Sequence, residues 1–200
     1  MTAGIAVVVV AAAVLLILRD RTEAQRSPGP RPTTLAGLET GPPPWPAEFG
    51  SLRERLRALG LPALGAQGTT LHIHQHLDIV VDGRKIEVPA FIGIDPSGTF
   101  ISPLHTHDTT GVIHVESPTV RDFTLGEFFG VWGLRFTTDC IGGMCNAGAS
   151  KLRVFVNGKP VAGDPADLVL RSHQEIVVAY GTKAQVPKPV PSSYNFPPGE

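Results

Sequence analysis

The stretch LHIHQHLDIVVDG at residues 71–83 decides the fold, because apolar and polar side chains alternate along most of it. Successive side chains of a β-strand point to opposite faces, so the alternation predicts a strand over 71–81. Asp82-Gly83 is typical of a hairpin turn, and residues 85–89 are expected to return as its second strand. The first strand then has one apolar face (Leu71, Ile73, Leu77 and Ile79) and one imidazole face (His72, His74 and His76).

Strand signals continue along the chain after this first hairpin. They predict a hairpin over 103–116 around a loop at 108–111, a hairpin over 152–161 around Asn157-Gly158, and a last strand over 175–180. Each predicted hairpin joins neighbouring segments, so most strand pairs are expected to be antiparallel.

A helix is expected between these hairpins. Thr124 has the character of an N-cap and Glu127 stands three residues later, at the capping-box position, so a helix is predicted over 125–132. Its aromatic residues are expected in the hydrophobic core (Phe128, Phe129 and Trp132). The sequence therefore predicts an α+β domain over 69–185, mainly of antiparallel β-hairpins with one short helix, for which a β-grasp-like roll is one arrangement.

The segments on either side of this domain have a different composition. Residues 2–18 carry no charge, which predicts a single N-terminal transmembrane helix over 1–19. Such a run reaches about 25 Å, slightly short of a bilayer core of about 30 Å. The remaining segments are predicted as a Pro-rich linker over 20–46, a short amphipathic helix over 47–61, and a disordered Pro-rich tail over 186–200.

The orientation of the predicted anchor depends on conflicting signals. Arg19, Arg21 and Arg26 follow the apolar run, and the positive-inside rule taken literally would place the domain in the cytoplasm. The short span without a preceding basic segment indicates a start further upstream, whereas the long Pro-rich linker and the closely spaced cysteine pair favour export. We therefore expect an extracytoplasmic domain at the cell membrane, with the lipid bilayer as a partner of the N-terminal helix.

Charge excludes one large class of partner. The 200 residues have a formal net charge of -1 and an isoelectric point near 6.7. Such a chain lacks the positive potential that attracts a phosphate backbone, so no nucleic-acid partner is expected.

The two cysteines, Cys140 and Cys145, flank a short Ile-Gly-Gly-Met segment. They can close a small disulfide loop outside the cytoplasm, or form a soft copper site together with Met144. The chain has only two methionines, which disfavours a Met-rich copper carrier, so the disulfide is the preferred interpretation.

The histidines carry the strongest chemical signal, since six of the seven lie between residues 72 and 114. A loop at 108–111 would pair His107 with Val112 and His105 with His114, and cross-strand partners project to the same face. Imidazoles that lie this close suppress each other's protonation, and neutral imidazole is a good ligand for zinc and copper. The predicted ligands are His74, His76, His105, His107 and His114, with His72, Asp108 and Glu116 as further candidates. His173 stands alone and is not assigned a role.

Three functions are compatible with this pattern. The preferred one is non-catalytic binding or buffering of a divalent transition metal, zinc or copper. The second is an enzyme in which three histidines and an open coordination position activate water, with Asp108 or Glu116 as general base. The third is a metal-free interaction module whose histidine face docks a protein. No GxSxG elbow or glycine-rich phosphate loop is present, and the sequence leaves catalysis undecided.

Three segments, LHIHQHLDIVVDG (71–83), LHTHDTTGVIHVESP (104–118) and FTLGEFFGVWG (123–133), resemble a group of largely uncharacterised membrane-anchored or secreted bacterial proteins. The shared signature is HxHxH followed by LHTHDxxGxIHVE, and the resemblance covers roughly 71–181. It implies that the histidine positions matter and implies no reaction. A looser similarity connects His105, His107 and Glu116 to the cupin metal motif, but the His-to-Glu spacing is longer and the second cupin motif is missing around His173.

Overall fold

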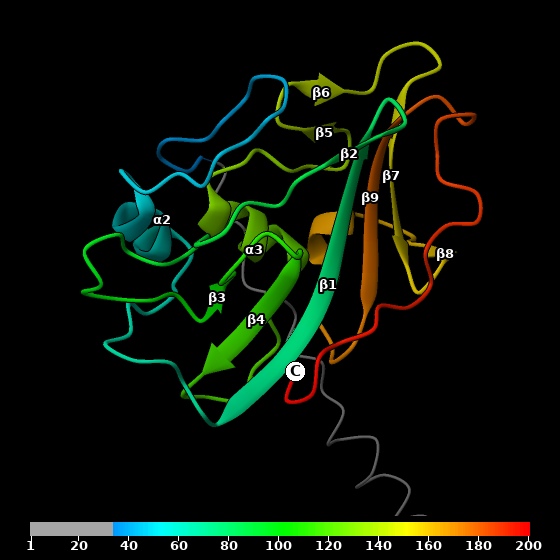
Figure 1. The fold of residues 1–200 in the computed structure, drawn as a ribbon. Coiled ribbons are helices and arrows are strands. Elements are labelled where there is room, and N and C mark those ends of the chain that lie inside the picture. Colours follow the sequence, from blue (N-terminus) through cyan, green and yellow to red (C-terminus); the bar gives the residue numbers. More distant parts are fainter. Residues whose placement is uncertain (1–33) are drawn as a thin grey trace, which may run out of the picture.

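The computed structural model describes residues 34–200, and its fold is α+β, with mostly strands and two short α-helices (Figure 1). The predicted membrane anchor over 1–19 lies outside the described residues. Within 34–200, neither helix has the length and apolar character that a bilayer span requires. The helices are α2 (Leu52–Ala58) and α3 (Leu125–Trp132), and a 3-10 turn covers Pro165–Asp167.

The strands form one large sheet and one small one. Their bounds are β1 (Leu71–Val81), β2 (Arg84–Ile86), β3 (Leu104–His105), β4 (Val112–Ser117), β5 (Cys140–Ile141), β6 (Met144–Cys145), β7 (Lys151–Val156), β8 (Lys159–Pro160) and β9 (Glu175–Gly181). The large sheet has the order β3-β4-β1-β9-β7-β8, with β2 paired to the far end of β1. The three predicted hairpins are present, whereas the parallel pairing of the central strands β1 and β9 is an addition that the sequence did not reveal.

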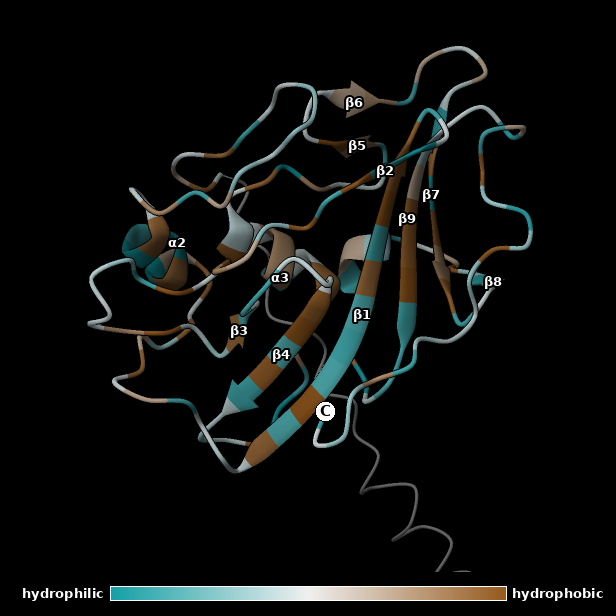
Figure 2. Ribbon diagram, viewed as in Figure 1, coloured by the Kyte–Doolittle hydropathy of each residue, from teal (hydrophilic) through white to brown (hydrophobic). Residues whose placement is uncertain are grey.

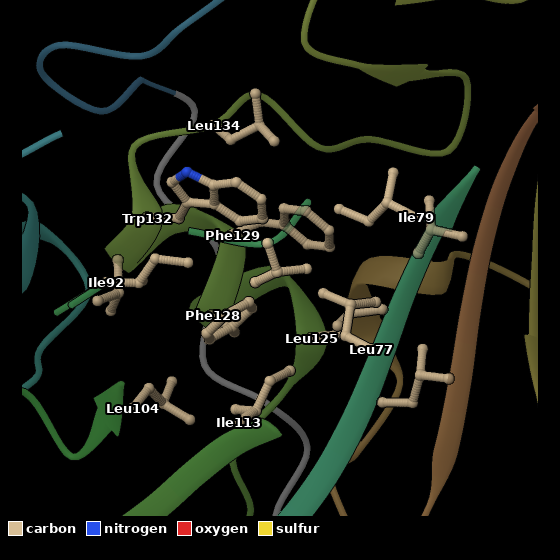
Figure 3. Close-up of a cluster of buried hydrophobic side chains, with 14 of the residues drawn as sticks. Leu77, Ile79, Ile92, Leu104, Ile113, Leu125, Phe128, Phe129, Trp132 and Leu134 are labelled. Carbon is tan, nitrogen blue, oxygen red and sulfur yellow. The ribbon is translucent and has the colours of Figure 1, made fainter. Parts of the chain in front are cut away.

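Helix α3 covers one face of the large sheet. It begins with the predicted capping box: Glu127 N–H donates to the Thr124 hydroxyl, and the Glu127 carboxylate accepts from Thr124 N–H. Its aromatic residues lie in the core as expected, among apolar side chains from β1, β3 and β4 (Figure 3). The helix ends at Gly133, which adopts the left-handed conformation (φ 84°).

The alternation along β1 separates two environments, and Figure 2 shows it as alternating hydrophobic and hydrophilic bands. Leu77 and Ile79 lie in the core with α3. His74 and His76 project from the other face, which therefore carries imidazoles.

Residues 34–46 differ from the extended spacer that their prolines predict. Trp45 is 2% exposed and belongs to the core, and Glu39 N–H donates to the carbonyl of Gly133. The folded unit therefore begins well before residue 69. Trp45 explains the difference, since burying a large aromatic surface offsets the entropy lost on ordering the segment.

The amphipathic segment also differs from its prediction. Helix α2 is shorter than the predicted 47–61, and one of its charged residues, Arg55, is fully buried. Its guanidinium pairs with the Glu48 carboxylate and donates to the carbonyl oxygens of Glu48 and Val131. Arg55 thus joins α2 to the end of α3. The spacing of apolar residues does not predict such a contact, because a charged side chain makes it.

The tail over 186–200, predicted to be disordered, lies along the sheet and ends beside β1 (Figure 1). The ring of Tyr194 stacks on His76 with centroids 3.8 Å apart and planes 6° apart. Phe196 and the carbonyl of Glu200 contact His173. Aromatic contacts of this kind are not visible in a Pro-rich composition, which explains why the sequence pointed to disorder.

The cysteine pair has the arrangement preferred from the sequence. Cys140 and Cys145 face each other on the β5–β6 hairpin, with their sulfur atoms at disulfide distance.

Candidate metal centre

Strand register brings the histidines of three strands into one row. His105 on β3 pairs with His114 on β4, and His114 pairs with His74 on β1. Glu116 pairs with His72 one step further along. Paired residues project to the same face, so five polar side chains from segments up to 44 positions apart meet on one face of the sheet.

The first candidate ligand set, here called the His105 group, consists of His105, His107, His114 and Glu116. The Nε2 atoms of His105 and His107 are 3.2 Å apart, and Nδ1 of His114 lies 3.3 Å from Oε1 of Glu116. The strand β3 ends at His105, so the predicted strand pair between His107 and Val112 does not form. The His107 ring nevertheless reaches the group.

The second set, here called the His72 group, consists of His72, His74 and Glu116. The Nε2 atoms of His72 and His74 are 3.2 Å apart, and Nε2 of His72 lies 3.3 Å from Oε1 of Glu116. The two groups adjoin, since the ring centroids of His74 and His114 are 4.5 Å apart. Glu116 belongs to both.

Hydrogen bonds fix which nitrogen of His105 faces the group. Its Nδ1 lies 3.0 Å from the carbonyl oxygen of Ser102, an acceptor, so in the neutral ring Nδ1 carries the proton and Nε2 presents a lone pair toward His107. Metal-binding histidines are held in this way, with the second ring nitrogen donating to a carbonyl or carboxylate. His105 is therefore oriented as a ligand.

His107 and His114 have nitrogens that hydrogen bonds alone do not satisfy. Nε2 of His107 lies between Nε2 of His105 and Nε2 of Gln67, at 3.2 and 3.0 Å, and it cannot donate to the first and accept from the second at once. Nδ1 of His114 is buried and makes no hydrogen bond. An unpaired buried nitrogen costs free energy, and an ion that accepts its lone pair removes that cost.

The spacing of the nitrogens suits a small tetrahedral ion. Ligand nitrogens at about 2.0–2.1 Å from a zinc ion lie about 3.3 Å from one another at tetrahedral angles. Both pairs of Nε2 atoms, at 3.2 Å, are at this separation. The ligand atoms of each group all lie within 4.8 Å of one another.

Three histidines of the two groups, His74, His105 and His114, remain neutral over a wide pH range. Burial, followed by the neighbouring imidazoles of His107 and His114, lowers the pKa of His105 to about 3. Burial and the nearby His107 and His74 lower the pKa of His114 to about 3, and burial with His72 lowers the pKa of His74 to about 4. These rings present lone pairs at neutral pH, which is the form that binds metal.

The two candidate carboxylates behave differently. Burial raises the pKa of Glu116, although His72 and His107 oppose the shift. The hydroxyl and N–H of Thr110 donate to Asp108 and hold the pKa of Asp108 below its usual range. Asp108 is exposed and belongs to neither group, whereas Glu116 lies at the centre of both.

His76 lies on the same face but outside both groups. Its Nδ1 is 2.7 Å from Oε2 of Glu175, and its Nε2 is 3.0 Å from the carbonyl oxygen of Thr110. Both neighbours are hydrogen-bond acceptors, so each ring nitrogen of His76 faces an oxygen rather than a free space in which an ion could bind. Asp78 completes a third set with His76 and Glu175, but it pairs with Lys85 at 2.6 Å.

No protein-family model, curated protein or solved structure matches the chain. The candidate centre therefore rests on its own geometry.

Of the sequence-predicted ligands, the structure brings His74, His105, His107 and His114 together and places His76 in a separate contact. Two further candidates, His72 and Glu116, also join the cluster. The sequence missed Gln67 and the carbonyl of Ser102, which contact His107 and His105. A glutamine in a loop and a main-chain oxygen give no pattern that sequence reasoning could have used.

The low pKa values predict an acid-sensitive metal-free protein. Between pH 3 and 6.5, the folded and ordinary pKa values of His105, only the unfolded chain binds the proton at this residue. Lowering the pH below 6.5 therefore favours unfolding, by about 1.4 kcal/mol per pH unit and about 2 kcal/mol at pH 5 for His105 alone. His74 and His114 act in the same direction. Urea unfolding in EDTA at pH 7 and pH 5 measures this difference.

The matched variant for this measurement is His105→Gln, whose amide can still donate to the Ser102 carbonyl but does not titrate. It should show a smaller loss of stability between pH 7 and pH 5 than the unsubstituted chain. Equal urea midpoints at the two pH values in the unsubstituted chain would contradict the prediction.

Proposed function

We propose that this protein binds a divalent transition metal, zinc or copper, through the clustered histidines, and that the binding is non-catalytic and serves to hold or buffer the ion. The observation that carries the proposal is the contact between His105 and His107. Their Nε2 atoms lie 3.2 Å apart while Nδ1 of His105 is committed to a backbone carbonyl. A shared ion uses both nitrogens at a distance that a tetrahedral site requires.

Ligand chemistry supports zinc or copper over harder ions. The His105 group offers three imidazole nitrogens and one carboxylate, and imidazole suits zinc and copper whereas magnesium and calcium prefer oxygen ligands. Burial of His105 and His114 excludes water from one side of the group, which strengthens the attraction between an ion and its ligands.

The test is elemental analysis of the full chain, purified in detergent without a histidine tag from a host that exports it. We expect near-stoichiometric zinc or copper in the unsubstituted protein and its loss in His105→Ala/His107→Ala, because the double substitution removes two of the four ligands. His107→Ala alone should weaken binding without a folding defect, because the His107 side chain is exposed.

His173→Asn is the matched control, since His173 belongs to no candidate group and asparagine tolerates its left-handed backbone (φ 59°). Its metal content should equal that of the unsubstituted chain. A folded protein that carries no metal, or a His105→Ala/His107→Ala protein that keeps its full metal content, would refute the proposal.

We also propose that the domain is extracytoplasmic and attached to the cell membrane by the N-terminal helix. The Cys140–Cys145 disulfide supports this, because disulfides persist in oxidising compartments and are rare in the cytosol. The charge-free run over 2–18 supports attachment to a bilayer. Protease accessibility of the domain in intact cells is the direct test, and protection there together with cleavage after lysis would refute it.

For the fold, we propose the β-grasp-like roll. Its support is the parallel pair β1 and β9 at the centre of the sheet, with the β4 and β7 strands outside them and α3 connecting the two halves along the chain. An experimental structure tests this assignment.

A further inference from the structure

The carboxylate of Glu116 lies between the two histidine pairs. Its Oε1 is 3.3 Å from Nε2 of His72, and its Oε2 is 3.9 Å from Nε2 of His105. One oxygen thus faces each pair. The side chain is only 5% exposed, and a carboxylate buried to this extent calls for compensating positive charge.

Three ring nitrogens face this carboxylate. Nε2 of His72 and Nδ1 of His114 each lie 3.3 Å from Oε1, and Nε2 of His105 lies 3.9 Å from Oε2. The Nδ1 atom of His114 is buried and 3.3 Å from Oε1 of Glu116 yet makes no hydrogen bond, so this nitrogen lacks a partner. Cations placed between the Glu116 carboxylate and the neighbouring ring nitrogens would bind both kinds of atom and make these contacts favourable.

The ligands are too many for a single ion. Five histidines and Glu116 make six donor residues, whereas zinc takes four ligands in most protein sites. The residues also divide into two sets, with 3.2 Å between the Nε2 atoms in each HxH pair. The carboxylate is common to both sets, which is the arrangement of a bridging ligand between two ions about 3.5–4 Å apart.

We infer that the histidine face is a dinuclear centre, in which Glu116 bridges one ion in the His105 group and a second ion bound by His72 and His74. This inference rests on the proposed metal-binding function and goes further, since one ion would satisfy that function. The second ion is the more accessible of the two, because the His72 side chain is 50% exposed. It is therefore expected to exchange faster.

Zinc stoichiometry by native mass spectrometry of the full chain in detergent tests the inference. We expect two zinc ions per chain in the unsubstituted protein and one tightly bound ion in His72→Ala, whose second ion should bind at least tenfold more weakly. The substitution is at a half-exposed side chain, so the fold should be kept. His173→Asn should still bind two ions.

Copper(II) as a spectroscopic probe tests the bridge separately. Two copper ions joined by the Glu116 carboxylate should give a spin-coupled signal in electron paramagnetic resonance. Glu116→Gln has the same shape but a poor bridging group, so it should give uncoupled copper signals or bind one ion. The coupled signal should also disappear in His72→Ala.

The outcomes separate the two proposals. One ion per chain in both the unsubstituted protein and His72→Ala would overturn the dinuclear centre and leave the metal-binding function intact. Two ions with uncoupled spins would overturn the Glu116 bridge. A chain that binds no zinc and no copper would overturn both proposals.

Discussion

Zinc added to the metal-free protein is expected to raise its free energy of unfolding by about 4 kcal/mol when free zinc exceeds its dissociation constant a thousandfold. The ligands come from β1, β3, β4 and the segment after β3, so the unfolded chain cannot assemble them. Because zinc binds only the folded state, the free energy of zinc binding adds to the free energy of unfolding. For a domain of this size, the corresponding rise in melting temperature is about 10 °C. Thermal unfolding with zinc and then with excess EDTA measures the change and its reversal.

Two controls test whether the shift in melting temperature comes from zinc bound by the histidines. Magnesium at the same concentration should leave the melting temperature unchanged, because it prefers oxygen ligands. His105→Ala/His107→Ala should respond little to zinc. An unsubstituted protein whose melting temperature is the same in zinc and EDTA would exclude a structural ion and leave the metal-free interaction module as the remaining interpretation of the histidine face.

The register of the hairpin between β3 and β4 was predictable from the sequence. This register aligns two of the candidate ligands. The hairpin between β3 and β4 aligns His105 with His114, because the length of the connection sets which residues face each other. The capping box at Thr124 and Glu127 is also local, since it depends on residues three positions apart. Such features need no knowledge of the rest of the chain.

Pairing between distant segments was not predictable in the same way. The alignment of His74 with His114 depends on β1 pairing with β4 across the 30 intervening residues 82–111, and neither strand sequence specifies that partner. The parallel pairing of β1 with β9 is more distant still. The role of Glu116 follows from these pairings, because only the register of β1 and β4 places its carboxylate between the two histidine pairs.

His76 shows how the surroundings override a residue pattern. In LHIHQHL it has the same face and the same spacing as His72 and His74. At its position, however, the neighbouring strand on the other side of β1 contributes Glu175. The carboxylate takes the ring nitrogen that a metal would need, so a regular HxHxH run divides into two candidate ligands and one buried ion-pair partner.

Substitution of His76 by leucine is expected to lower the free energy of unfolding by about 1–3 kcal/mol, the usual cost of leaving a buried polar group without its hydrogen-bond partner. His76 and Glu175 are 3% and 1% exposed, and Oε2 of Glu175 hydrogen-bonds with Nδ1 of His76 at 2.7 Å. His76→Leu therefore strands a buried carboxylate and removes the ring on which Tyr194 stacks. Urea unfolding measures the loss, and metal content should stay unchanged.

The double variant His76→Leu/Glu175→Leu separates the ion pair from simple packing. Replacing both partners by apolar residues removes the stranded charge, so the double variant should be more stable than His76→Leu. Lys85→Ala is the matched comparison, because its pair with Asp78 is at the surface, with Lys85 67% exposed, and should cost less than about 1 kcal/mol. If His76→Leu instead lost metal while keeping its stability, His76 would be a ligand after all, and the division of the HxHxH run would have to be redrawn.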